Sequence, residues 1–118
     1  MTVEADIYSA LSALVTGRVF PHIAPPDTAR PYITYQQIGG VAESYEEDVP
    51  VNLKNGRIQF DVWSNDFKLS AALMLDVEAA LISSATFQAR PVGANSSSYE
   101  VDTKLHGRQQ DFSIWSVR

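Results

Sequence analysis

Arg57-Ile-Gln-Phe-Asp-Val-Trp-Ser64 and Arg108-Gln-Gln-Asp-Phe-Ser-Ile-Trp-Ser116 are two segments with nearly the same pattern. Each begins at an arginine, alternates polar with apolar residues and ends at Trp-Ser. Alternation with a period of two is typical of a β-strand that has one buried face. The residues expected on the buried faces are Ile58, Phe60 and Val62 in the first segment and Phe112 and Ile114 in the second. We therefore predict two strands of one sheet.

Both tryptophans depart from this pattern. Trp63 and Trp115 fall on the polar side of their strands, opposite the aliphatic residues. A large aromatic side chain on a solvated face needs a cover, because its apolar area is costly to hydrate. Either a loop or helix of the same chain covers the tryptophans, or they contact another protein. The pattern alone leaves both alternatives open.

Length and composition restrict the class of protein. The chain has 118 residues, 45% of them hydrophobic, and we expect a single domain over residues 1–118. Cysteine is absent, so we expect neither a disulfide nor a thiolate site. The net charge is −5 and the basic residues are scattered, which argues against specific nucleic-acid binding. The acidic N-terminus is not that of a signal peptide, and no apolar stretch is long enough to cross a membrane.

Helical periodicity appears twice. Thr2 is a candidate N-cap, and apolar residues then recur at helical spacing, so we predict a helix over about residues 3–15. A second apolar stripe predicts a helix over about 67–83, capped by Asn65 or Asp66. Leu75 and Ile82 lie off that stripe, which indicates that a second side of this helix is also covered.

The rest of the chain reads as strands, turns and loops. Residues 18–31 form a proline-rich connector, 50–56 a turn with Asn55-Gly56, 93–98 a polar loop and 105–107 a turn. Strands are expected at 32–38, 41–49, 57–64, 86–92, 99–103 and 108–117, with 86–92 at an edge because of Pro91. The predicted order is α-β-β-β-α-β-β-β. We expect an α+β fold, a mainly antiparallel sheet with two helices packed on one face.

The sequence offers little evidence for a catalytic site. His22 lies in the connector and His106 beside Gly107, and Asp102 with His106 lacks a nucleophile in a recognisable context. Of the acidic run at 46–48, only Glu46 and Asp48 would share a face of a strand, and a solvated acidic arm explains them. No phosphate-binding glycine pattern occurs. We predict no catalytic residue, no metal and no cofactor.

Three segments carry a resemblance to a known family: 31–40 (PYITYQQIGG), 55–64 (NGRIQFDVWS) and 99–115 (YEVDTKLHGRQQDFSIW). The chain resembles the tail-terminator or tail-completion proteins of long-tailed bacteriophages and prophages, from its first helix to its last strand. The resemblance implies a structural protein that forms a hexameric ring, caps the tail tube and ends its polymerisation. Its implied partners are other copies of itself, the tail tube protein and head–tail connector proteins, with DNA passing through the ring.

The implied location is the host bacterial cytoplasm during assembly and then the virion tail. The resemblance brings no functional residue with it, so the candidate interface comes from aromatic and charged character alone. The candidates are Trp63, Trp115, Tyr45, Glu43, Glu46, Glu47, Asp48, Lys54 and Arg57. Two alternatives are a head–tail joining protein of the same particle and a small hydrolase that uses Asp102 and His106.

Overall fold

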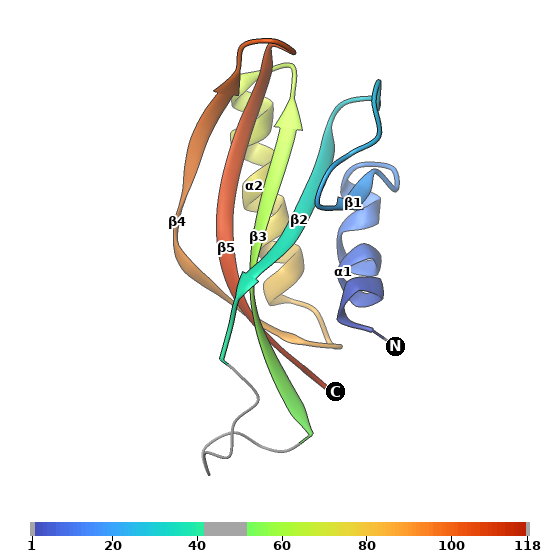
Figure 1. Cartoon of the computed structure of the whole chain (residues 1–118), viewed down its shortest axis with the longest axis vertical. Coiled ribbons are helices and arrows are strands. Elements are labelled where there is room, and N and C mark those ends of the chain that lie inside the picture. Colours follow the sequence, from blue (N-terminus) through green and yellow to red (C-terminus); the bar gives the residue numbers. More distant parts are fainter. Residues whose placement is uncertain (1, 42–51, 118) are drawn as a thin grey trace.

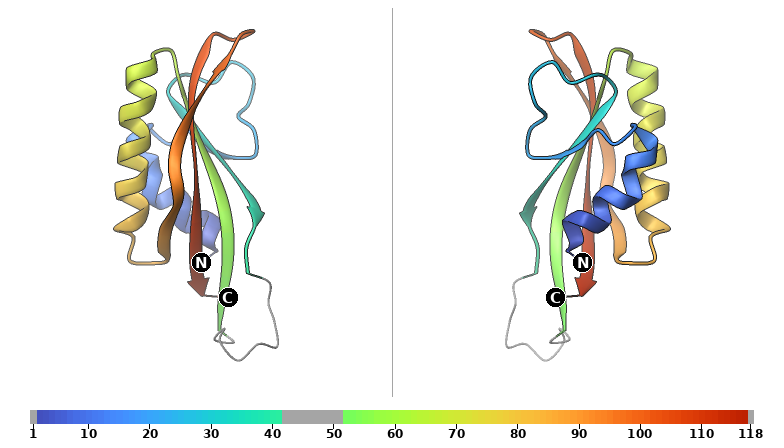
Figure 2. Two further views of the ribbon diagram at one scale, coloured as in Figure 1. Left: turned by 90° about the vertical axis from the view of Figure 1, so that its left-hand side faces the viewer. Right: turned by 90° about the vertical axis from the view of Figure 1, so that its right-hand side faces the viewer.

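The computed structural model describes residues 2–41 and 52–117. Two helices and five strands occur in these ranges, and both helices cover the same face of the sheet (Figures 1 and 2). The elements are α1 (Val3–Leu11), a 3₁₀ turn (Ser12–Leu14), β1 (Val19–Pro21), β2 (Tyr32–Gly39), β3 (Leu53–Ser64), α2 (Phe67–Ile82), β4 (Gln88–Glu100) and β5 (Leu105–Val117). The predicted α+β fold is confirmed.

The sheet has the strand order β1-β2-β3-β5-β4. β1 runs parallel to β2, and every other neighbouring pair is antiparallel. The two similar segments form the centre, where β3 pairs with β5 from Leu53↔Val117 to Ser64↔His106. Each therefore has a neighbour on both sides, whereas β4 lies at an edge, as Pro91 predicted.

The core lies between the sheet and the helices. Phe60 of β3 and Phe112 of β5 are fully buried and meet edge to face, with ring centroids 5.6 Å apart. Ile58 and Ile114 are also buried, so the aliphatic faces predicted for both segments are the core faces. The helices complete the core with one apolar stripe each, through Val3, Ile7 and Leu11 of α1 and Leu73, Met74, Val77 and Leu81 of α2.

Both helices begin at the residues that the sequence indicates. The Thr2 hydroxyl accepts a hydrogen bond from the amide of Ala5, and the Asp66 carboxylate accepts one from the amide of Leu69. The predicted second cover of α2 does not come from the described part of this chain, because Leu75 is 59% exposed and Ile82 is 53% exposed.

The predicted turn at Asn55-Gly56 is wrong. Both residues lie inside β3, paired with Trp115 and Ile114. The side chain of Asn55 hydrogen-bonds outward instead: its amide nitrogen donates to the Ser113 hydroxyl, and its oxygen accepts from the amide of Val41. A Cβ on Gly40 would come within 2.6 Å of the Asn55 carbonyl oxygen, so a close approach of two backbones explains glycine there.

The structure has two long strands, β4 and β5, where the sequence predicted three shorter ones. Residues 93–98 belong to β4 and contain a bulge between Val92 and Ser96, where Gly93 has φ +81°. Side chains of β5 hold the bulge: Gln110 donates to the Gly93 carbonyl at 3.1 Å, and Arg108 donates to Asn95 at 2.8 Å. The reversal occurs at 101–104, so the turn predicted at 105–107 is also wrong, and β5 begins at Leu105.

The proline-rich connector contains one element that the sequence did not predict. Val19–Pro21 forms β1, and Ile33 donates its amide to the Arg18 carbonyl beside it. The rest of the connector projects on the side of the sheet away from α2 (Figure 2). The predicted strand at 41–49 lies, apart from Val41, outside the described residues. No helix within 2–41 and 52–117 is long and apolar enough to cross a membrane.

Candidate interaction surface

The side of the sheet that faces away from the helices is called the open face here. Burial alternates along β3 and β5, so the odd-numbered residues of both strands point to this side. The register places Tyr32, Thr34 and Gln36 of β2 opposite them. The open face comprises these three residues, Arg57, Gln59, Asp61 and Trp63 of β3, and Gln109, Asp111, Ser113 and Trp115 of β5. Its centre is polar, and a tryptophan lies toward each end.

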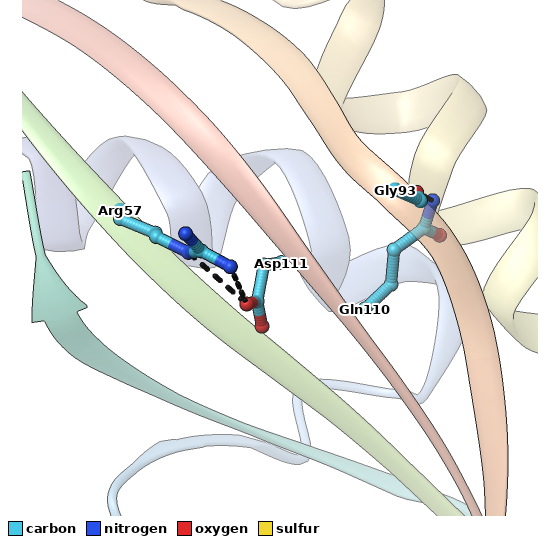
Figure 3. A network of polar contacts seen from close by, with 4 residues as sticks. All are labelled: Arg57, Gly93, Gln110 and Asp111. Atoms are coloured by element: carbon cyan, nitrogen blue, oxygen red, sulfur yellow. Dashed lines mark hydrogen bonds and ion pairs between the residues drawn. The ribbon is translucent and has the colours of Figure 1, made fainter.

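Charged side chains pair across the two central strands. The Arg57 guanidinium donates to one oxygen of Asp111 through Nη2 at 2.8 Å and through Nε at 3.1 Å (Figure 3). The Arg57 side chain is 49% exposed, so this ion pair contributes little stability, of order 0–1 kcal/mol. Arg57 was predicted as an interface residue, and it lies on the open face with an anionic partner, Asp111, already in place.

Asp61 is the least satisfied charge on this face. It is partly buried, and its carboxylate accepts one hydrogen bond from the Gln59 amide at 3.1 Å. Burial raises the pKa of Asp61, the nearby Asp111 charge raises it further, and the Gln59 hydrogen bond opposes both. Within residues 2–41 and 52–117 no lysine or arginine forms an ion pair with Asp61.

Trp63 is covered in part by its own chain. The indole lies on Gly107 of the neighbouring strand, where a Cβ would come 2.8 Å from Cζ3 of the ring. The indole also lines a pocket of about 390 Å³ between the connector, the open face and the end of the β4–β5 hairpin. Leu105 forms part of the floor of this pocket and is buried although it belongs to the open face. Trp63 is thus covered in part by its own chain, and its contact with another protein, the other sequence alternative, remains a prediction.

Trp115 lies at the opposite end of the open face. It is partly buried and lines a second pocket, of about 430 Å³, at the free edge of β4. The other walls come from Ile82 at the end of α2 and from Gln88 to Pro91 of β4. This pocket therefore lies beside the exposed apolar side of α2.

The other predicted interface residues do not form one surface with the tryptophans. Lys54 points to the helix side of the sheet, where it lines a small pocket with Val3 and Ile58. Tyr45, Glu43, Glu46, Glu47 and Asp48 lie outside the described residues. Their assignment to an interface remains a prediction from the sequence.

The residues considered for catalysis are arranged differently from an active site. His106 is partly buried on the helix side, with its ring 4.9 Å from the Tyr99 ring and 6.3 Å from the Phe67 ring, measured between centroids. Asp102 lies in the turn between β4 and β5. In the described parts of the chain, no cluster of three or more His, Asp or Glu side chains could hold a metal ion.

Several residues of the Trp63 pocket could not be found from the sequence. The connector and Tyr32 are distant in sequence from Glu100 and Leu105, and only the pairing of the strands and the position of the connector bring them together. Asp61 had a signal, since it alternates with the aliphatic residues of β3, but that signal predicted only exposure.

An α+β chain with a charged sheet face and two half-covered tryptophans is typical of the class of subunits that bind other proteins. The comparisons with known proteins specify that class. The model of the family "Tail completion protein gp17" matches residues 8–116, and the chain belongs to this family. It is therefore a structural protein of a phage-type tail and not an enzyme, as the sequence indicated.

One solved structure supports the fold. A chain in the structure titled "Virion of native gene transfer agent (GTA) particle" is 16% identical, and the match covers 98% of this chain and 95% of that one with a TM-score of 0.61. At this identity the likeness concerns the fold. Among curated proteins no sequence matches significantly.

Proposed function

We propose that this protein caps the head-proximal end of a phage tail tube and ends its polymerisation, as one subunit of a homo-oligomeric ring. The observation that carries the proposal is the match to the tail completion family over residues 8–116. Its partners are then copies of itself, the tail tube protein and the head–tail connector proteins. DNA passes through the ring without specific binding, and assembly takes place in the bacterial cytoplasm.

Exposed apolar side chains support contacts between subunits. Ile82 of α2 is 53% exposed and lines the pocket beside Trp115, and Leu75 of the same helix is 59% exposed. Large aromatic groups are enriched at the centres of protein interfaces, and these centres are more apolar than the rest of the protein surface. We assign the edge around Trp115 to the contact with a neighbouring subunit.

Tube growth in vitro tests this function. Purified tail tube protein is allowed to polymerise with and without this protein, and tube lengths are measured by negative-stain electron microscopy. We expect shorter tubes that carry a ring at one end. Trp115→Ala should weaken capping while the thermal unfolding curve shows a folded chain, and Asp76→Asn, on the solvent side of α2, is the matched control.

Two results would contradict the proposal. Tubes of unchanged length with no density at their ends would exclude capping. Binding to the portal-side connector with none to the tube end would instead assign the protein to head–tail joining.

A further inference from the structure

We propose that the pocket beside Trp63 is a binding site for the guanidinium group of an arginine side chain carried by another polypeptide. The pocket has a volume of about 390 Å³ and lies between the connector, the open face and the β4–β5 hairpin. Asp61, Glu100, Trp63 and Tyr32 supply the chemistry of its wall. The inference does not depend on capping, because it concerns the isolated chain.

The carboxylates of Asp61 and Glu100 carry the negative charge that would attract a cation to this pocket. Asp61 accepts one hydrogen bond from the Gln59 amide, and Glu100 accepts one from the Thr103 hydroxyl. In the described ranges neither forms an ion pair with a lysine or arginine. A partly buried carboxylate without a cation is unfavourable, so an incoming guanidinium would relieve a cost that the free protein bears.

The aromatic walls favour arginine over other cations. Trp63 and Tyr32 are directly opposite each other on β3 and β2, and both line the pocket. A planar guanidinium stacks on aromatic rings and can donate two parallel hydrogen bonds to one carboxylate. Burial raises the pKa of the Tyr32 hydroxyl, the nearby Glu100 charge raises it further and Arg30 opposes both, and Glu100 and the Tyr32 ring line the same pocket.

The pocket also contains a cation of its own chain, Arg30. That side chain is exposed, its Nη1 donates to the Asn65 side chain at 3.4 Å, and in the described residues it forms no ion pair with either carboxylate. Asp27 lines the pocket as well, so carboxylates outnumber Arg30 there. The balance of charge favours a cationic ligand.

Apolar side chains at the rim indicate that the ligand is part of a polypeptide. Ile23 in the connector lines the pocket and is 80% exposed, and Val101, the residue after Glu100 in sequence, is 75% exposed. A segment of a partner that inserts its arginine into the pocket would cover Ile23. A free small cation would leave it in water.

Titration with a short peptide followed by ¹⁵N NMR tests the inference. The probe is acetyl-Gly-Arg-Gly-amide, and the control is the same peptide with citrulline, which keeps the shape and removes the charge. The chain has two tryptophans, so Trp115 provides an internal reference for the indole signal of Trp63. We expect saturable shifts at the Trp63 indole and at the amides of Asp61 and Glu100, with Trp115 unchanged.

Variants make the outcome decisive. Asp61→Asn should weaken binding about tenfold, the loss expected for one charge-assisted hydrogen bond, and Glu100→Gln should also weaken it. Asp76→Asn, which removes the same charge from the opposite side of the molecule, should bind like the wild type. Equal shifts with the citrulline peptide, or unchanged binding by Asp61→Asn, would overturn the inference. Since no tail component takes part, failure here leaves the capping proposal standing, and failure of capping leaves this site standing.

Discussion

Gly107 lies at a position of β5 where a side chain would not fit. The Trp63 ring and the Ser98 hydroxyl both lie where a Cβ would be, at 2.8 Å and 2.6 Å. The backbone of β5 is thus the surface on which Trp63 rests. Because Gly107 has no Cβ, the Trp63 indole, the largest side chain in the proposed site, can pack directly on the backbone of β5.

Replacing Gly107 with alanine should move this indole or strain the sheet. We expect the free energy of unfolding to fall by about 1–3 kcal/mol, the usual cost of overpacking, together with a change in tryptophan fluorescence. Urea unfolding measures the first effect. Gly39→Ala is the matched control, because a Cβ there meets nothing within 4 Å. If both variants had the same free energy of unfolding, the Trp63 ring would have moved away from the added methyl group at no measurable cost.

Asp61 should make stability depend on pH. Its folded-state pKa is raised above the unfolded value of about 3.8, so the folded protein binds the proton more tightly. Stability then decreases as the pH rises from 3.8 through the folded pKa, and the penalty is fully present above it. Asp61→Asn, which can still accept from Gln59, should therefore raise Tm at pH 7 and lose this advantage below about pH 4. A lower Tm at pH 7 would show that the ionised carboxylate stabilises the fold.

At the scale of elements, the beginning of α2 depends on hydrogen bonds between side chains and backbone. Asp66 caps the helix, while the Ser64 hydroxyl meets the Ser70 hydroxyl at 2.6 Å. Ser70 in turn donates to the His106 carbonyl. These bonds tie the first turn of the helix to the ends of β3 and β5.

Removing the cap should be measurable without disturbing the core. Asp66→Ala should destabilise the protein by about 1 kcal/mol, the typical value of an N-cap. Asp66→Asn, which retains a capping oxygen, should lose much less. Thermal denaturation compares the two variants, and equal losses would assign the effect to the charge of Asp66 and not to its hydrogen bond.

Local patterns predicted the elements better than the connections between them. The alternation in 57–64 and 108–116 and the helical stripes are properties of neighbouring residues, and the structure confirms them. Asn55-Gly56 and the polar run 93–98 have turn composition, yet tertiary pairing with β5 keeps both in strands. Side chains of Gln110 and Arg108, remote in sequence, stabilise the bulge that makes this possible.

The site was predictable only in part, for a related reason. Alternation placed Trp63 on the polar face, but it could not reveal that the connector projects on this side of the sheet and lines a pocket with Trp63 (Figure 2). Lys54 and Arg57, grouped by charge and proximity in sequence, point to opposite sides because their positions differ by an odd number in one strand.

At the scale of the molecule, the position of each strand predicts its protection from hydrogen exchange. β3 and β5 have neighbours on both sides, whereas one edge of β4 has no partner strand in the described chain. We expect the slowest amides in the paired centre of β3 and β5, and faster exchange at alternate residues of β4. NMR-detected exchange measures this. Uniform protection along β4 in solution would indicate that its edge is already covered by another copy.

The Trp63 and Trp115 pockets lie at opposite ends of an elongated subunit, 47 Å long and 24 Å across. Rotational symmetry about one axis repeats every surface once per subunit and never turns a subunit over. If the subunits close into a ring of that symmetry, all arginine pockets lie at one height along the axis. An axis along the length of the subunit would then give the ring two chemically different rims. The two sides of such a ring are not equivalent. A partner that approaches one rim would therefore meet different residues from a partner that approaches the other rim.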